Sequence, residues 1–231
     1  MNVLCLFLAF GSALLLQSCG ADTPPAQRAN PPGARPRPAT AVKPPDEAAH
    51  PTDSASLEVV QEQVLAQLHN DPVVGNVGHD FVHLLAIYQR SVRAGALVEL
   101  RTGRDPALRK VAAAARDHAQ QIGAEADRLA QILHGRARNY QPNDVNDPFT
   151  RGVRASLQES FRAHAAVQLP DHDFAALLLG QWQSEATIAR AALNTGRLPR
   201  PAQVLARRVL IARPAETRLL RAVLSRPHAK S

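Results

Sequence analysis

Apolar residues recur every three or four positions along most of the chain after residue 53, which is the spacing of one face of an α-helix. In the strongest such stretch, residues 79–102, the apolar stripe consists of Phe81, Leu84, Leu85, Tyr88 and Val92. We find no segment with the strict apolar–polar alternation that marks a half-buried β-strand. The pattern therefore predicts an all-α chain.

Glycine and proline mark the ends of the predicted helices. The run that starts at residue 79 ends at Thr102-Gly103, and Asp105-Pro106 then opens a new helix with a capping carboxylate followed by a proline. Pro214 lies inside the last helix, so we expect that helix to be kinked or split near 211–213. The helices are predicted over 56–69, 79–102, 106–134, 149–168, 172–195 and 200–225.

The chain contains an internal repeat. Residues 79–113 and 172–206 are identical at 14 of 35 aligned positions without a gap, whereas unrelated sequences would share roughly three. The turn chemistry is repeated too, because Thr195-Gly196 and Pro199 follow the second copy. Duplication of a helical hairpin is the simplest explanation. Two such hairpins predict a four-helix bundle, with one extra helix before each hairpin.

The composition divides the chain into a packed part and an unpacked part. The helical bundle is predicted over 54–226, with its repeats at about 54–134 and 149–226 and a short tail at 227–231. Nine of the 18 prolines lie between residues 22 and 53. Proline lacks a backbone donor and favours extended chain, so residues 19–53 are predicted to form a tether.

The first residues resemble a bacterial lipoprotein signal. An apolar run at 3–16 has the length of a signal peptide, and LLQSCG at 15–20 resembles the lipobox. The resemblance implies removal of residues 1–18, lipidation of Cys19 and, because Gly20 follows, sorting to the outer membrane. An ordinary secretory signal cut nearby is the alternative. The remaining cysteine lies in the signal, so no disulfide is expected in the mature chain.

The sequence RTGRDPALRKVA at 101–112, together with Phe81 and Phe174, resembles a motif of secreted bacterial ferritin-like bundles of unknown function. The resemblance implies a ferritin-like four-helix bundle and, from that family's His-Met cluster, a site for copper or another metal. The family's His-His pair falls here on Tyr88-Gln89 and Gln181-Trp182. Its methionines fall on Leu85, Gly95, Leu178 and Ile188. These departures predict that the ancestral ligands are missing.

Other residues are candidates for a rebuilt metal site. His79 and His83 lie one helical turn apart, as two ligands would, whereas His172-Asp173 repeats only His79-Asp80. The interpretation that we favour is that Asp80, Asp105 and Asp173 cap the starts of helices. We therefore predict no cofactor. A transition metal (copper or iron) bound by His79, His83, His172 and Asp173 is the alternative hypothesis.

The sequence has no nucleophile or phosphate-binding motif. An enzymatic role would have to use His118 or Glu185, and we expect Glu185 at the water-exposed edge of the apolar stripe. Between residues 196 and 231 there are nine Lys or Arg and one acid. This basic C-terminal helix would suit an anionic envelope surface, with solvated arginines as the alternative, and without stacking aromatics it does not favour nucleic acid. The sequence thus predicts a non-enzymatic envelope lipoprotein that binds or scaffolds.

Overall fold

The computed structural model describes residues 56–71, 73–162, 169–211 and 214–226. The predicted signal, Cys19, the tether, part of the fourth predicted helix and the tail lie outside these ranges. Within them the chain is all-α, as predicted, and its helices are α1 (Leu57–Asn70), α2 (Val77–Thr102), α3 (Pro106–Leu133), α4 (Pro148–Arg162), α5 (Pro170–Asn194), α6 (Arg200–Val209) and α7 (Pro214–Leu224). No helix in these ranges combines the length and the apolar character needed to cross a lipid bilayer.

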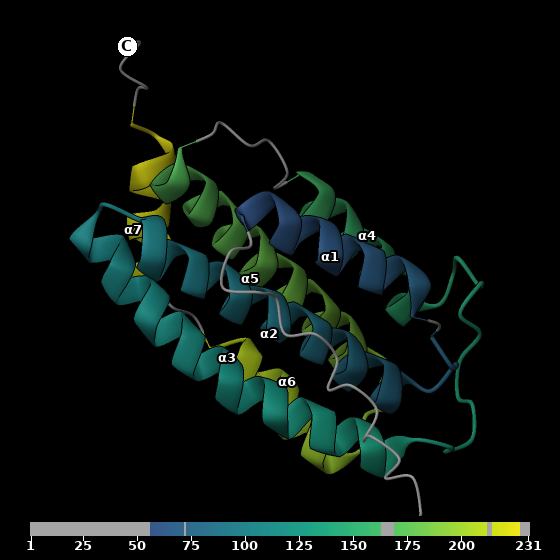
Figure 1. The fold of residues 1–231 in the computed structure, drawn as a ribbon. Coiled ribbons are helices and arrows are strands. Elements are labelled where there is room, and N and C mark those ends of the chain that lie inside the picture. Colours follow the sequence, from purple (N-terminus) through teal and green to yellow (C-terminus); the bar gives the residue numbers. More distant parts are fainter. Residues whose placement is uncertain (1–55, 72, 163–168, 212–213, 227–231) are drawn as a thin grey trace, which may run out of the picture. The chain divides into compact units, whose positions relative to one another are not determined.

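The helices between residues 57 and 224 form what we call the helical unit. They are arranged around a central pair, α2 and α5 (Figure 1). On one side of the pair lie α1 and α4, and on the other lie α3, α6 and α7. The pair is antiparallel, because Gly78 of α2 approaches Pro199 beyond the end of α5, while Asp171 of α5 accepts a hydrogen bond from Arg104 beyond the end of α2. Most of α2 is buried, and along one narrow face lie the exposed residues Arg90, Arg93, Leu97 and Arg101.

The two halves of the described chain repeat the same order of helices. α2 begins at Val77 and α5 at Pro170, the same offset of 93 that aligns the sequence repeat. A helix precedes each of them, and a further helix follows beyond a short turn. The halves differ in this last element, because α3 is one helix of 28 residues whereas its counterpart is divided into α6 and α7. The division predicted at Pro214 is confirmed, since α7 begins there.

Helix starts differ from the prediction at two of the three proposed caps. Asp105 occupies the N-cap of α3 and accepts hydrogen bonds from the amides of Ala107 and Leu108 at 2.8 and 3.3 Å. In contrast, α2 starts after Asn76 and α5 starts at Pro170, so Asp80 and Asp173 lie inside the first turns of these helices. The cause is that the asparagine side chain, and proline at the first helical position, favour helix starts further upstream.

Candidate functional site

The centre of the unit holds a network of uncharged hydroxyl groups. The Tyr88 hydroxyl donates to Ser156 Oγ at 3.2 Å, and the Oγ atoms of Ser160 and Ser184 lie 2.9 Å apart. From α1, Gln61 Nε2 donates to the Ser160 carbonyl at 3.2 Å. Burial raises the pKa of the Tyr88 phenol, which therefore stays neutral. A position that carries histidine in the resembling family is thus part of a neutral network that joins α1, α2, α4 and α5, and hydroxyls are poor ligands for soft metals.

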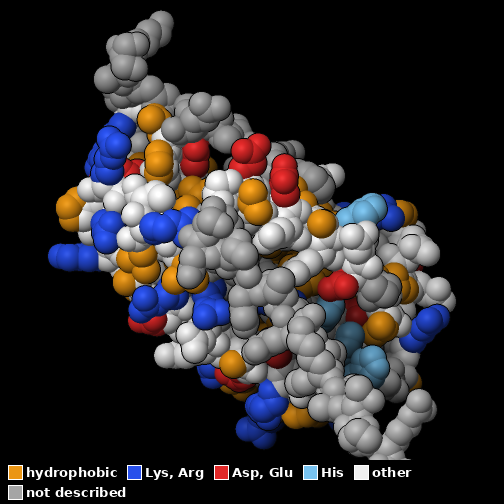
Figure 2. Space-filling model, viewed as in Figure 1, with side chains coloured by type: hydrophobic (Ala, Val, Ile, Leu, Met, Phe, Trp, Pro, Cys, Tyr) orange, Lys and Arg blue, Asp and Glu red, His pale blue; other side chains and the backbone are white. Residues whose placement is uncertain are grey.

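Three histidines gather at the start of α2, in the region where Figure 2 shows pale blue side chains close together. The ring centroids of His79 and His83 lie 5.7 Å apart, and those of His79 and His134 lie 5.6 Å apart. His79 Nδ1 is 3.0 Å from the Asp80 carboxylate, and His83 Nε2 is 3.2 Å from that of Asp71. In the described part of the chain, no three His, Cys, Asp or Glu side chains converge where they could hold a metal ion.

The structure does not bring the four predicted metal candidates together. Because α2 and α5 are antiparallel, His172 and Asp173 lie near the C-terminal end of α2, whereas His79 and His83 lie at its N-terminal end. The 26 residues of α2 place these ends roughly 35–40 Å apart. The residue that does join the cluster is His134, which sequence reasoning missed because it stands alone, far from the other two in the chain.

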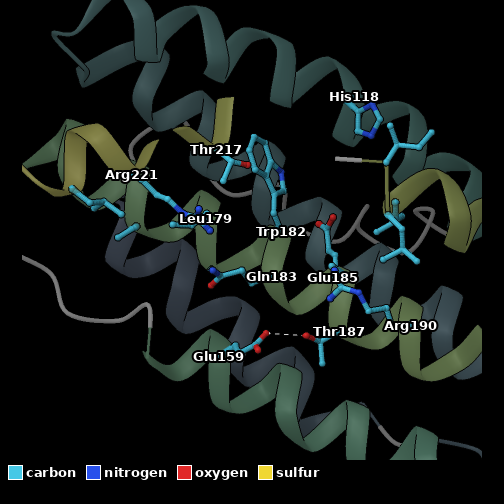
Figure 3. Close-up of a pocket in the computed structure, with 17 residues that line it drawn as sticks. His118, Glu159, Leu179, Trp182, Gln183, Glu185, Thr187, Arg190, Thr217 and Arg221 are labelled. Atoms are coloured by element: carbon cyan, nitrogen blue, oxygen red, sulfur yellow. Dashed lines mark hydrogen bonds between the residues drawn. The ribbon is translucent and has the colours of Figure 1, made fainter. Parts of the chain in front are cut away.

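A pocket of about 630 Å³ opens along one face of α5, bounded by α6 and α7 (Figure 3). His118 of α3 and Glu159 of α4 also reach it. Its volume lies in the range of small-molecule sites, about 300–1,000 Å³. The side chains that give it its character are Leu179, Trp182, Glu185, Arg190, Arg221 and Leu224.

His118 and Glu185, the two residues that an enzymatic role would have required, line this same pocket. The expectation that Glu185 lies at a water-exposed edge is wrong, because its side chain is only 5 % exposed. The sequence could not reveal this burial, since it depends on helices far along the chain that cover α5. Trp182 stands at a position that carries histidine in the resembling family and here contributes an aromatic wall.

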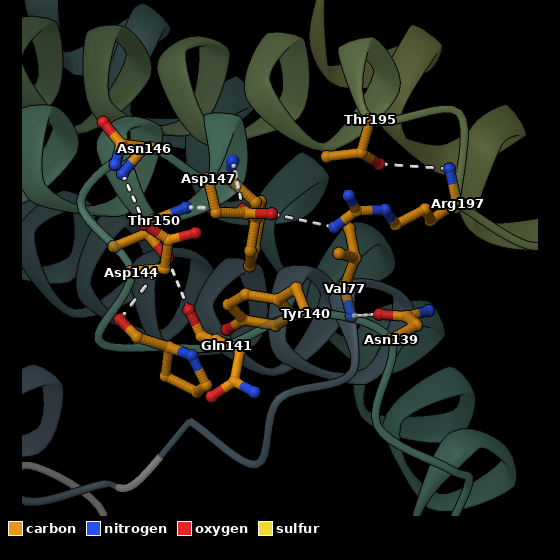
Figure 4. A network of polar contacts seen from close by, with 12 residues as sticks. Val77, Asn139, Tyr140, Gln141, Asp144, Asn146, Asp147, Thr150, Thr195 and Arg197 are labelled. Atoms are coloured by element: carbon orange, nitrogen blue, oxygen red, sulfur yellow. Dashed lines mark hydrogen bonds and ion pairs between the residues drawn. The ribbon is translucent and has the colours of Figure 1, made fainter.

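The loop between the halves is fixed to the start of α2. The Asn139 and Tyr140 amides donate to the Gly75 carbonyl at 2.8 and 3.1 Å, and the Val77 amide donates to Asn139 Oδ1 at 2.9 Å (Figure 4). Gly75 has a φ of 89°, a conformation that favours glycine. At the far end of the loop, Asp147 accepts a hydrogen bond from Arg197 at 2.8 Å. The predicted connecting loop therefore ties the two halves together.

Asp80 is the centre of this junction. Its side chain is 1 % exposed, and one carboxylate oxygen accepts from the Val74 amide and from His79 Nδ1, both at 3.0 Å. The other oxygen accepts from the Gly75 amide at 2.9 Å and from the Tyr140 hydroxyl at 2.7 Å. Burial and the charge of Asp80 raise the pKa of Tyr140, which keeps its proton available for this bond.

A second buried carboxyl group, Glu99, lies near the end of α2. Its side chain is fully buried, and neither carboxylate oxygen has a hydrogen-bond donor within the described residues. Burial, and then the neighbouring Asp171, raise the pKa of Glu99 to about 8. Any side chain at position 103 would clash with this carboxyl group, which explains the glycine there. The sequence contained an indication of this burial that sequence reasoning missed, because Glu99 lies on the same helical face as the apolar residues Val92 and Ala96.

The comparisons add no family to this geometry. No family model matches the chain. No curated protein and no solved structure is significantly similar to it either. A functional conclusion therefore depends on the pocket, on the histidine cluster and on the buried carboxyl groups.

Proposed function

We propose that this chain is a cell-envelope lipoprotein whose ferritin-like helical unit binds a ligand without catalysis. The observation that carries the proposal is the pocket on α5, because its volume and its mixture of aromatic, aliphatic and charged side chains are those of a small-molecule site. The repeated helix order around α2 and α5 supports a bundle of two duplicated hairpins. The hydroxyl network at the centre supports a role other than that of the resembling family's metal site.

The proposed location depends on the N-terminal resemblance. A lipid on Cys19 would anchor the chain in the outer membrane, and the proline-rich residues 19–53 would hold the helical unit away from the surface. The basic C-terminal segment contributes less free charge than the sequence alone indicates. Three of its arginines form ion pairs with acids of the unit, namely Arg197 with Asp147, Arg208 with Glu125 and Arg226 with Asp105. Among the described residues, the exposed Arg200, Arg207 and Arg218 remain for an anionic envelope surface.

Filling the pocket is expected to abolish ligand retention. Ala176 lines the pocket, so Ala176→Phe would occupy its space, whereas Ala114→Phe places the same ring on an exposed position of α3. Native mass spectrometry of the full chain, purified from its own membrane, should show a bound small molecule in wild type and in Ala114→Phe but not in Ala176→Phe.

Two results of the same measurement would contradict the proposal. Equal retention by both phenylalanine variants would place the ligand elsewhere. A bound metal ion that is retained by wild type and lost in His83→Ala would favour the alternative function, a metal-binding bundle.

The anchor is tested separately. Metabolic labelling with a fatty-acid analogue is expected to mark the wild-type chain and to leave Cys19→Ser unmarked, because the thiol is the acceptor in a lipobox. Cys5→Ser is the matched control and should be labelled as wild type. Labelling that persists in Cys19→Ser would contradict the lipoprotein assignment.

A further inference from the structure

We infer that the pocket on α5 binds an amphipathic anion, a small molecule with a phosphate or carboxylate group on an apolar body. This inference rests on the proposed function, because it names the chemical class of ligand for the same pocket. The pocket's apolar walls and its charged groups point to this class independently of each other.

The apolar part of the pocket comes from three helices. Trp182 and Leu179 belong to α5 and Leu224 belongs to α7, and Leu210, the C-cap residue of α6, adds a further apolar side chain. Ile211, at the end of this wall, is 69 % exposed, the most exposed large apolar side chain among the described residues. A ligand with an apolar body would cover this surface, and each buried methylene contributes about 0.8 kcal/mol to binding.

The acidic groups of the pocket are already engaged by the protein. Glu159 accepts a hydrogen bond from the Thr187 hydroxyl at 3.1 Å. Glu185 is buried and interacts with other groups of the chain. Both carboxylates therefore already have partners within the protein.

The two arginines of the pocket, in contrast, are available to a ligand. Arg190 and Arg221 are exposed, and their side chains make no hydrogen bond or ion pair with any described residue. In Figure 3 they lie on either side of Trp182 and Glu185, so the apolar wall runs between two guanidinium groups. Arginine is well suited to phosphate and carboxylate, which it binds through paired N–H donors.

Both parts of the ligand are needed. An ion pair with an exposed arginine contributes little on its own, because water and salt screen it. An apolar body alone would leave the two guanidinium groups without a role. The combination of a charged group at one end of the wall and an apolar body along it uses both features.

The test exploits the single tryptophan of the chain, Trp182, whose fluorescence reports occupancy of the pocket. The full chain in a neutral maltoside detergent is titrated with hexyl phosphate, inorganic phosphate or hexylammonium. We expect a saturable change in emission with hexyl phosphate alone. Arg190→Gln or Arg221→Gln should raise the dissociation constant roughly tenfold. Arg218→Gln, an exposed arginine of α7 outside the pocket, should leave it unchanged.

The contrary outcomes separate this inference from the proposed function. If inorganic phosphate bound as tightly as hexyl phosphate, an apolar body would not be part of the ligand that the pocket recognises. If hexylammonium bound instead, and Glu185→Gln abolished that binding, the ligand would be a cation rather than an anion. The pocket would still be the binding site. No response to any probe, with a co-purified ligand still lost in Ala176→Phe, would overturn the amphipathic anion and leave the proposed function standing.

Discussion

Asp80→Asn is expected to lower the free energy of unfolding by about 3 kcal/mol. Each oxygen of the Asp80 carboxylate accepts two hydrogen bonds, one of them from a backbone amide. An asparagine amide has only one oxygen, so in either orientation its NH₂ group would face two donors. The group is 1 % exposed, and water cannot replace the lost bonds.

The measurement is urea unfolding of the full chain, followed by circular dichroism at 222 nm. Asp117→Asn is the matched control, because Asp117 is exposed and, among the residues that the structure describes, pairs only with its neighbour Arg116; it should change stability by less than about 0.5 kcal/mol. Tyr140→Phe, which removes one of the four donors, should cost about 1 kcal/mol. If Asp80→Asn unfolds with wild-type stability, the carboxylate does not hold the junction.

The fold was predictable to the extent that it is local. Helical periodicity and the glycine and proline positions gave the helices, and Pro214 gave the division between α6 and α7. The role of Asp80 was not predictable, because its partners in the loop at residue 140 are brought to it only by the tertiary fold. A carboxylate at the start of a helix has the same sequence signature whether it caps that helix or holds a distant loop.

The candidate site was predictable only in part. His118 and Glu185 were identified as chemically interesting residues, but the pocket that contains both exists because α6 and α7 are separate helices that pack beside α5. The arginines of the C-terminal segment looked alike in the sequence. Three of them prove to be paired with acids, whereas Arg221 borders the pocket, and only the distances separate these roles.

The buried Glu99 is expected to make stability depend on pH. Its pKa is about 8 in the folded protein and near 4.5 in the unfolded chain. Between these values the folded state holds a proton that the unfolded state has released, so folding takes up a proton. The stabilisation is therefore fully present below about pH 4.5 and is lost as the pH rises through 8. At about 1.4 kcal/mol for each pKa unit, a rise from 4.5 to about 8 corresponds to a loss on the order of 5 kcal/mol.

Glu99→Gln is expected to remove this dependence. The glutamine amide is neutral at every pH and is close in size to the protonated carboxyl group that it replaces. Wild type and variant should have similar stability at pH 5, and the variant should be more stable by about 4 kcal/mol at pH 8.5. Comparing the two pH curves cancels contributions from histidines and other groups, which both proteins share.

Glu62→Gln, on the exposed face of α1, is the control and should follow the wild-type curve. Parallel curves for wild type and Glu99→Gln would show that the Glu99 carboxyl group titrates alike in the folded and unfolded chains. Asp171→Asn gives a further check, because it removes the neighbouring carboxylate that raises the pKa of Glu99. Because asparagine carries no negative charge, this substitution should lower the pKa of Glu99. The loss of stability should then occur at a lower pH than in the wild type. The carboxyl pair at the junction of α2, α3 and α5 would then be identified as the group that makes this end of the unit sensitive to alkaline conditions.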